Sequence, residues 1–512
     1  MDTRFRMCWL LILSLAVALV LIAACPSSSP AAPAGKKEII VVQGADIQRM
    51  DPHMSTSDPD VKVIFNIFDN LIFRGPDNKL HPGLATEWKA LNDTTWQFKL
   101  RRGVKFHNGE PFNAEVAKFS LERTFPSGDP KVMTRTIFST CERVDVVDPY
   151  TINIVTKAPD PLLLDRIAWY GGQIIPMAYY KKVGADEFNA KPVGTGPLKF
   201  LERVKDDHTT FEANKDWFGG KLAFERITYK PMPEPAARVA ALLKGEADIV
   251  TVLPPDDVER VEKSANAEAV KVPYAGLYVL GTNYKRPFPM DNKEFHQALS
   301  LAIDREAIVK DLWRGLGVVP NGFDVTTDWT YDRSRPPLEY NVAKAKELLK
   351  KINYKGEEIF LESTSGFMTN DKVMSEAIVA MWKEAGINAK LEIVEFSVRA
   401  QKDREKSFKG LWWTNPLSTL NDPDGLIYRL TGPRAAQDYI RIPEYDRLMQ
   451  EARTTLDQAK RKANYDAAHK IAMDYLWWIP VIQPIQSYGI QKFLKAEIMG
   501  SNDMPVEYIQ FK

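Results

Sequence analysis

Hydrophobic and polar residues alternate along the chain with two periods, one typical of strands and one typical of helices. Residues 39–42 form a short run of β-branched residues, which predicts a strand buried on both faces. Residues 95–100 alternate apolar and polar side chains, as a strand does. From Pro235 the apolar residues recur at helical spacing as far as Gly245, a residue type that commonly ends helices.

The same pattern continues through the rest of the chain. Asn108-Gly109 predicts a tight turn, and Asn113 can cap the helix that follows it. Asp371 can cap a helix that ends near Gly386, after which residues 387–396 alternate as a strand. Helices that alternate repeatedly with strands predict an α/β fold.

Length and composition set the number of domains. The chain has 512 residues, and single hydrophobic cores stop growing beyond roughly 250–300 residues, so we expect two or three domains. An 11% aromatic content with balanced charge is enough to bury apolar surface, which excludes a disordered chain. The 68 basic and 67 acidic residues are interspersed, so no basic face for nucleic acid is expected.

The first residues have the pattern of an export signal. Arg4 and Arg6 precede an uncharged run at residues 9–24, which predicts a signal peptide over residues 1–24. Small residues before Cys25 resemble the bacterial lipobox, after which Cys25 receives lipid; an ordinary cleaved signal with an incidental cysteine is the alternative. Residues 25–35 are rich in Pro, Ala and Ser and predict a flexible tether. We therefore expect a lipid-anchored body in the periplasm or at the cell surface.

Few residues of the body carry reactive chemistry. Cleavage before Cys25 removes Cys8, and acylation of Cys25 leaves Cys141 as the one free thiol, which we expect to be a packed core residue. The six histidines are far apart in sequence, so no metal site is expected. Common nucleophile and phosphate-binding motifs are missing, and Pro197 would break the helix of a dinucleotide fingerprint that begins at residue 193. No enzyme activity and no cofactor are expected.

Several short segments occur in an order typical of one known family. The chain resembles the extracytoplasmic solute-binding proteins of the dipeptide, oligopeptide and nickel class (family 5), which serve ATP-driven (ABC) importers. The segments that carry the resemblance are residues 50–53, 67–71, 82–88, 96–114, 193–197, 214–218, 245–249, Asn283 with 287–288, 302–305 and 422–424.

The resemblance implies a large periplasmic-binding-protein-like α/β fold of class II, cluster C. Such a fold has two main lobes, an extra inserted domain and a hinge cleft. Lobe I would comprise residues 36–72, 192–282 and 483–512. Lobe II would be inserted at 73–191, and lobe III would comprise 283–482.

The resemblance also implies a function and a set of contact residues. A monomer would capture a peptide-like or other small organic solute by hinge closure and deliver it to a membrane permease. Solutes compatible with the family include peptides, opines, oligosaccharides and metal chelates. The expected ligand contacts are Trp412, Trp413, Thr414, Asn415, Asp422, Asp51, Asn283 and Tyr284. Adjacent residues of a strand point to opposite faces, so one of the two tryptophans is expected to face the cleft.

One expected residue is missing from this segment. Peptide-binding members of the family have an Asp shortly after a Gly-Trp pair, where it holds the α-ammonium group of the ligand. That position here falls on Asn415, Pro416, Ser418 or Thr419, none of which carries a negative charge. Asp422 could replace the missing Asp if the loop is reshaped. We therefore expect aromatic stacking and neutral hydrogen bonds to hold the ligand.

Two other classes of function remain as alternatives. A tethered extracytoplasmic hydrolase would need a nucleophile and a base brought together from distant segments. A chaperone-like binder would hold unfolded chains rather than one solute.

Overall fold

The structure is a computed structural model that describes residues 35–55, 57–365, 368–418, 420–433, 437–501 and 503–512. The predicted signal peptide, Cys25 and all but the last residue of the predicted tether lie outside these residues. Within the described part of the chain, no helix has the length and apolar character that a membrane span requires.

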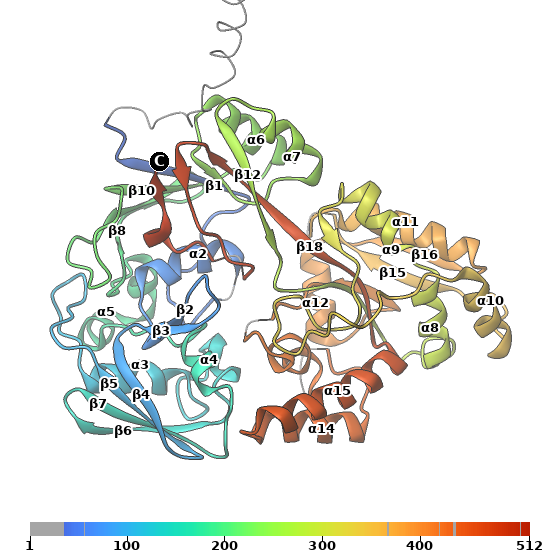
Figure 1. Cartoon of the computed structure of the whole chain (residues 1–512), viewed down its shortest axis with the longest axis horizontal. Coiled ribbons are helices and arrows are strands. Elements are labelled where there is room, and N and C mark those ends of the chain that lie inside the picture. The colour runs from blue at the N-terminus through green and yellow to red at the C-terminus, as the bar shows by residue number, and fades with distance from the viewer. Residues whose placement is uncertain (1–34, 56, 366–367, 419, 434–436, 502) are drawn as a thin grey trace, which may run out of the picture.

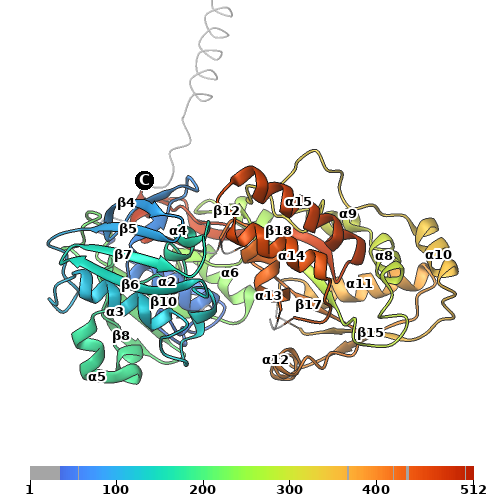
Figure 2. The same cartoon turned by 90° about the horizontal axis from the view of Figure 1, so that it is seen from below.

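The molecule consists of two bodies that lie side by side (Figures 1 and 2). The first body contains the described residues up to Pro273 and those from Ile485 onward, and the second body contains residues 278–482. A twelve-stranded sheet reaches into both bodies.

In the first body, β1 lies in the middle of its part of this sheet, parallel to β10 and β11. Ile39 of β1 lies opposite Ile227 of β10, and both side chains are fully buried. The elements are β1 (Glu38–Gln43), β8 (Leu198–Val204), β9 (His208–Ala213), β10 (Arg226–Pro231), β11 (Ile249–Val250), β12 (Ala267–Pro273), α2 (Asp58–Ile67), α5 (Met177–Ala190), α6 (Pro235–Lys244), α7 (Pro255–Glu262), β19 (Leu494–Lys495), β20 (Gln510–Phe511) and the 3₁₀ turn η4 (Val506–Tyr508).

A separate four-stranded antiparallel sheet forms the lower part of the first body, in the order β4-β5-β7-β6. Its buried face and α3 enclose a core of their own, which contains Cys141. The elements are β2 (Ile72–Arg74), β3 (Leu80–Pro82), β4 (Ala85–Asn92), β5 (Thr95–Leu100), α3 (Ala114–Thr124), η1 (Met133–Thr136), β6 (Cys141–Asp148), β7 (Thr151–Thr156) and α4 (Leu163–Ile167).

The second body continues the large sheet in the order β16-β15-β17-β13-β18. Strand β17 lies between β13 and β15, so it is an inner strand of this sheet. The elements are β13 (Tyr278–Thr282), α8 (Lys293–Leu301), α9 (Arg305–Ala307), η2 (Ile308–Leu312), β14 (Gly317–Val318), α10 (Val342–Lys351), β15 (Ile359–Ser363), α11 (Asp371–Glu384), β16 (Ala389–Ile393), α12 (Phe396–Glu405), β17 (Leu411–Thr414), η3 (Asp424–Tyr428), α13 (Arg429–Thr431), α14 (Pro443–Thr454) and α15 (Gln458–Tyr475).

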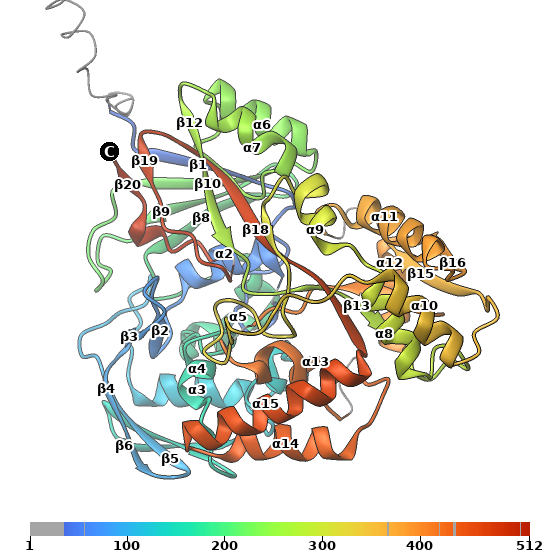
Figure 3. The same ribbon diagram turned by 45° about the vertical axis from the view of Figure 1, so that its right-hand side comes forward.

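One strand, β18 (Trp478–Gln491), belongs to both bodies (Figure 3). Its first residues pair with β13 in the second body, and residues 485–491 pair with β12 in the first. The chain also crosses between the bodies at residues 273–278, where the register on β18 shifts between Tyr278 and Val279. Tyr274 N–H donates to Pro484 O (2.9 Å), which ties the two crossings together.

The structure confirms the predicted α/β class and most of the local predictions. Residues 39–42 and 95–100 are strands, and Asn113 caps α3 by accepting a hydrogen bond from Val116 N–H (3.1 Å). Two predictions were inaccurate at their boundaries. Asn370, not Asp371, is the residue that precedes α11, and the predicted strand over 387–396 is shorter, because α12 begins at Phe396.

Candidate functional site

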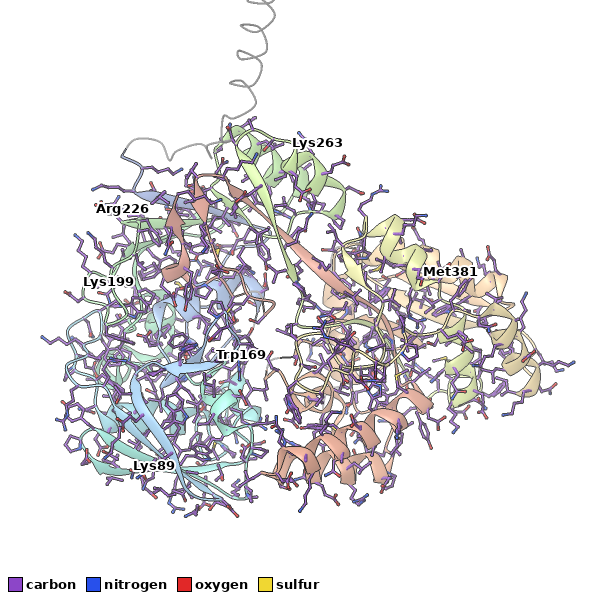
Figure 4. All side chains as sticks on the ribbon, in the orientation of Figure 1. Lys89, Trp169, Lys199, Arg226, Lys263 and Met381 are labelled. Atoms are coloured by element: carbon purple, nitrogen blue, oxygen red, sulfur yellow. The ribbon has the colours of Figure 1, made fainter. Side chains whose placement is uncertain are left out.

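A cleft lies between the two bodies, beside the two crossings. Two adjoining parts of it hold about 1070 and 1280 Å³ of space, open solvent included, and they share Arg74, Asn78, Thr327 and Asn421 in their walls. The first body contributes residues 74–78, 161–169 and 497–501, and the second contributes 326–329, 418, 420–422 and 456–461. Trp169 lies on the side of the first body that faces the second (Figure 4).

Each wall of the cleft carries a charged pair, and Glu497 adds a further carboxylate to the wall of the first body. On the first body, the Arg74 guanidinium contacts the Asp165 carboxylate. On the second body, Asp422 accepts hydrogen bonds from Arg461 Nη2 (2.7 Å), Tyr465 Oη (2.6 Å) and Trp329 Nε1 (2.9 Å). Within each of these pairs the opposite charges largely cancel.

The two charged pairs act on one another across the cleft. The pKa of Asp165 is raised to about 6, chiefly by burial; Arg74 lowers it, and the negative charge of Asp422 raises it. A ligand that neutralised or displaced one of these pairs would therefore shift the pKa values of the other pair.

Tryptophan and aliphatic side chains together supply the apolar surface of the cleft. Trp169 is 7% exposed and lies beside Tyr170 (ring centroids 4.7 Å apart), with Leu420 of the second body in the same apolar cluster. Among the described residues, the Trp169 indole N–H has no acceptor. The cleft thus has aromatic rings in its walls, a surface suited to organic solutes.

The bodies also touch one another directly. Arg166 Nη2 of α4 lies 3.2 Å from Asp424 Oδ2 of the second body. Asn421 Nδ2 donates to Asn78 Oδ1 (2.6 Å). The structure therefore shows the two walls in contact rather than fully separated.

Of the predicted contact residues, Asp422 lies in the wall of the cleft. Trp412 and Trp413 do not line it, and each is 1% exposed. Trp412 stacks on Phe408 (centroids 4.5 Å apart) and lies beside Tyr439, whereas Trp413 donates from Nε1 to Ser375 Oγ of α11 (2.6 Å). They point to opposite faces of β17, as predicted, but both faces of this inner strand are covered.

The remaining predicted contacts make hydrogen bonds within the protein. Asp51 accepts two bonds from Arg123 (2.9 and 2.7 Å). Asn283 donates to Phe408 O (2.6 Å), and Tyr284 donates to Tyr475 O. Thr414 Oγ1 accepts from Gln437 Nε2 (3.0 Å).

Asn415 follows β17 and is half-buried. Thr419, one of the positions at which the missing Asp was expected, lies outside the described residues.

One carboxylate near the cleft was missed by the sequence analysis. Asp328 is 5% exposed and accepts a hydrogen bond from Ser418 Oγ, so a carboxylate reaches one of the positions where the expected Asp is missing. Burial raises its pKa to about 8. Asp328 is 90 residues from Ser418 in sequence, and no local pattern indicates that the two meet.

The described residues contain no group of three or more His, Cys, Asp or Glu side chains that could hold a metal ion. Cys141 is 1% exposed, and burial raises the pKa of its thiol.

Comparison with known proteins agrees with this geometry. The profile of the bacterial extracellular solute-binding proteins, family 5, matches residues 79–438. Di/tripeptide-binding protein 1 of Pseudomonas aeruginosa (strain UCBPP-PA14) is 26% identical over 498 residues, covering 88% of this chain and 92% of that protein.

Two solved structures have the same fold. One is a dipeptide-binding protein from Pseudoalteromonas sp. SM9913 in complex with Met-Leu (TM-score 0.84, 21% identity, 93% of this chain and 100% of that one). The other is AgaA from A. tumefacien R10 in complex with agropinic acid (TM-score 0.80, 24% identity, 93% and 99%). They show that the chain has the two-lobe class II fold of periplasmic binding proteins.

The profile match spans more than half of the chain, so the protein belongs to family 5 of the bacterial extracellular solute-binding proteins. It is a solute-binding protein of the kind that serves ABC importers.

Proposed function

We propose that the protein captures a peptide-like or other small organic solute in the cleft between its two bodies and delivers it to the permease of an ABC importer. The observation that carries this proposal is the cleft itself, whose walls come from both bodies while the chain crosses between them beside it. A ligand that touches both walls stabilises the closed form by its contacts with each. The protein acts as a monomer and breaks no bond of the solute.

The side chains of the cleft define the contacts. We assign ligand contact to five residues of the cleft: Trp169, Trp329, Asn78, Asn421 and Asp422. Asp422 already accepts hydrogen bonds from three donors, so it is not a free counter-charge for an ammonium group. The solute is therefore held by ring faces and hydrogen bonds, with peptides and opine-like acids as the first compounds to test, because relatives are named for or bound to such ligands.

The three-lobe division also enters as a proposal. The core of the first body's large sheet, the core of its lower sheet and the core of the second body are separate clusters, which supports lobes I, II and III in that order. The β13 strand packs in the second body, so we place the boundary between lobes I and III at residues 273–278.

Mass spectrometry of denatured protein tests the function. The protein is purified without refolding and then denatured, and any released small molecule is identified. A peptide or other organic solute that also raises the melting temperature of the emptied protein, without being consumed, is the expected result. Turnover of that solute, or stabilisation by unfolded proteins in place of small solutes, would overturn the proposal.

The membrane anchor is a second part of the proposal. Cys25 receives lipid after cleavage of residues 1–24, and residues 25–35 tether the body to the membrane. In cells that express the Cys25→Ser variant, the protein should move from the detergent phase to the aqueous phase of a Triton X-114 partition. The Cys8→Ser variant, which alters a cysteine inside the predicted signal, should stay in the detergent phase.

A further inference from the structure

A second pocket opens beside the cleft, within the first body. It holds about 1460 Å³ of space, open solvent included, and shares Arg74, Trp169 and Met499 with the wall of the cleft. The side of Trp169 that borders the cleft is therefore close to this pocket. We call this pocket the side pocket.

Three segments that are distant in sequence build one wall of the side pocket around Asp69. Thr195 Oγ1 donates to Asp69 Oδ2 (2.7 Å), and Trp217 Nε1 donates to Asp69 Oδ1 (3.3 Å). The Thr195 loop can approach this closely because its glycines lie on the end of α2, where a Cβ on Gly194 would be 1.9 Å from Ile67 O. The Asp69 carboxylate is thus held in a fixed position.

The C-terminal segment adds two more carboxylates. Asp503 is 5% exposed, and its Oδ1 has no hydrogen-bond partner among the described residues. No other described residue donates a hydrogen bond to the Glu507 carboxylate, which receives one from its own backbone N–H. Ser501 Oγ donates to the other oxygen of Asp503, Oδ2 (2.9 Å). With Asp69, these groups give the pocket an acidic wall.

Three positive charges act near this wall, and each also has another partner. The charge of Lys62 lowers the pKa of Asp503, and Lys62 forms an ion pair with Asp58 (2.5 Å). The charge of Arg101 lowers the pKa of Asp69. Arg74 is already in contact with Asp165, and Arg101 lies over the Phe218 ring (4.6 Å to the centroid) while it donates to Gly83 O (3.1 Å). Burial is the largest cause that raises the pKa of Asp69 to about 6 and the pKa values of Asp503 and Glu507 to about 7. Each carboxylate would gain from a nearby cation.

Aromatic rings form the rest of the pocket. The lining includes the rings of Phe65, Phe68, Phe73, Trp169, Trp217, Phe218 and Tyr508. Ring faces attract cations, and aromatic walls with carboxylates suit an organic cation better than a metal ion. The three carboxylates also do not form a group that could hold a metal.

We propose that the side pocket binds a small organic cation, an ammonium or guanidinium group, at one end of a solute whose remainder lies in the cleft. The geometry that carries it is the unpartnered Asp503 Oδ1 and the Glu507 carboxylate beside Asp69, among aromatic rings next to the cleft. This inference rests on the proposed function, because it takes the cleft to be the place where the solute binds. It adds that the solute carries a cationic group at one end.

Choline and its neutral isostere 3,3-dimethyl-1-butanol test the inference on the full-length protein. Trp217 lies in the pocket wall, so its indole N–H resonance in ¹H–¹⁵N spectra reports occupancy; the Trp217→Phe variant assigns that resonance. Choline should shift it saturably and the isostere should not. Separate titrations with n-butylammonium and n-butylguanidinium show which kind of cation fits best.

Two variants and a matched control complete the test. Glu507→Gln and Asp503→Asn should each weaken choline binding about tenfold, since each removes one nearby charge. Glu87→Gln, which changes an exposed carboxylate on β4, should leave it unchanged. Equal binding of choline and the isostere, no binding of any cation, or full choline affinity in both folded variants would each overturn the inference.

A variant that fails to fold does not block the test, because the comparison of choline with its isostere uses the unaltered protein. Failure of this inference can also be told apart from failure of the proposed function. If mass spectrometry identifies a released solute but no cation binds the side pocket, the proposed function stands and this inference falls. A released solute without a cationic group would overturn it as well.

Discussion

Arg166 and Asp424 join the two bodies across the cleft, with Arg166 Nη2 3.2 Å from Asp424 Oδ2 and both side chains 4% exposed. Arg166 also contacts Asp160 in its own body, and Asp424 also contacts Arg453 in the other. The contact between Arg166 and Asp424 exists only while the bodies meet. It therefore favours the closed arrangement before any solute is bound.

Removing this contact should shift the ligand-free protein toward an open form. In the Asp424→Asn variant the closed form loses a charged hydrogen bond of about 1.5–3 kcal/mol, whereas in the open form water solvates Arg166. The radius of gyration from small-angle X-ray scattering should therefore increase in the absence of ligand. Asp145→Asn, which removes an exposed ion-pair partner of Arg143 within the first body, is the control. An unchanged radius for Asp424→Asn would refute the role of this pair.

The tryptophans of β17 and the tryptophans of the cleft should respond differently to substitution. Trp412→Ala should lower the free energy of unfolding by about 3–5 kcal/mol, because it leaves a cavity between Phe408 and Tyr439. Trp329→Phe removes an indole donor to Asp422 and should change solute affinity more than stability. Chemical denaturation and titration with the identified solute measure the two effects. A Trp412→Phe variant of normal stability with strongly reduced affinity would instead place Trp412 among the ligand contacts.

The buried carboxyl of Asp328 predicts a definite dependence of stability on pH. Its pKa is raised to about 8, well above the ordinary value of an exposed Asp. Between about pH 4 and pH 8 the folded state therefore keeps a proton that the unfolded state has lost. The free energy of unfolding therefore falls as pH rises through this window. Asp69, Asp165, Asp503 and Glu507 act in the same direction.

The Asp328→Asn variant tests this dependence. Melting temperature should fall less between pH 5 and pH 8 in the variant than in the unaltered protein, by an amount that corresponds to up to about 1.4 kcal/mol per pH unit. Asp332→Asn, on a half-buried Asp of the same loop whose pKa is lowered by hydrogen bonds from Ser334, should keep the original slope. An unchanged slope in Asp328→Asn would show that this carboxyl is ionised in the folded protein.

Cys141 should be unreactive while the protein is folded. Burial in the core of the lower sheet raises the pKa of its thiol, and the thiolate is the reactive form. Iodoacetamide should modify Cys141 slowly at neutral pH and rapidly in denaturant, as peptide mapping of the modified chain will show. Rapid modification in buffer alone would mean that this core opens readily.

Local sequence patterns were enough for most elements but not for the site. The β5 strand and the Asn113 cap depend on neighbours within a few residues, so their patterns were readable. The burial of Trp412 and Trp413 depends on the position of β17 between two other strands, which no local pattern reveals.

The charged pairs of the cleft depend on distant residues in the same way. Arg74 and Asp165 are 91 residues apart in sequence and come together through the fold. The family resemblance therefore predicted the two-lobe fold, and the contacts of the ligand stay a prediction.

Strand β18 has a consequence for how the protein unfolds. Because one backbone supplies hydrogen bonds to β13 in one body and to β12 in the other, melting of either body leaves part of that strand without partners. The two bodies should therefore unfold cooperatively, although each has its own core. A loss of structure in one body would propagate along this shared backbone, so that a partly melted protein would have neither of its cleft walls in place.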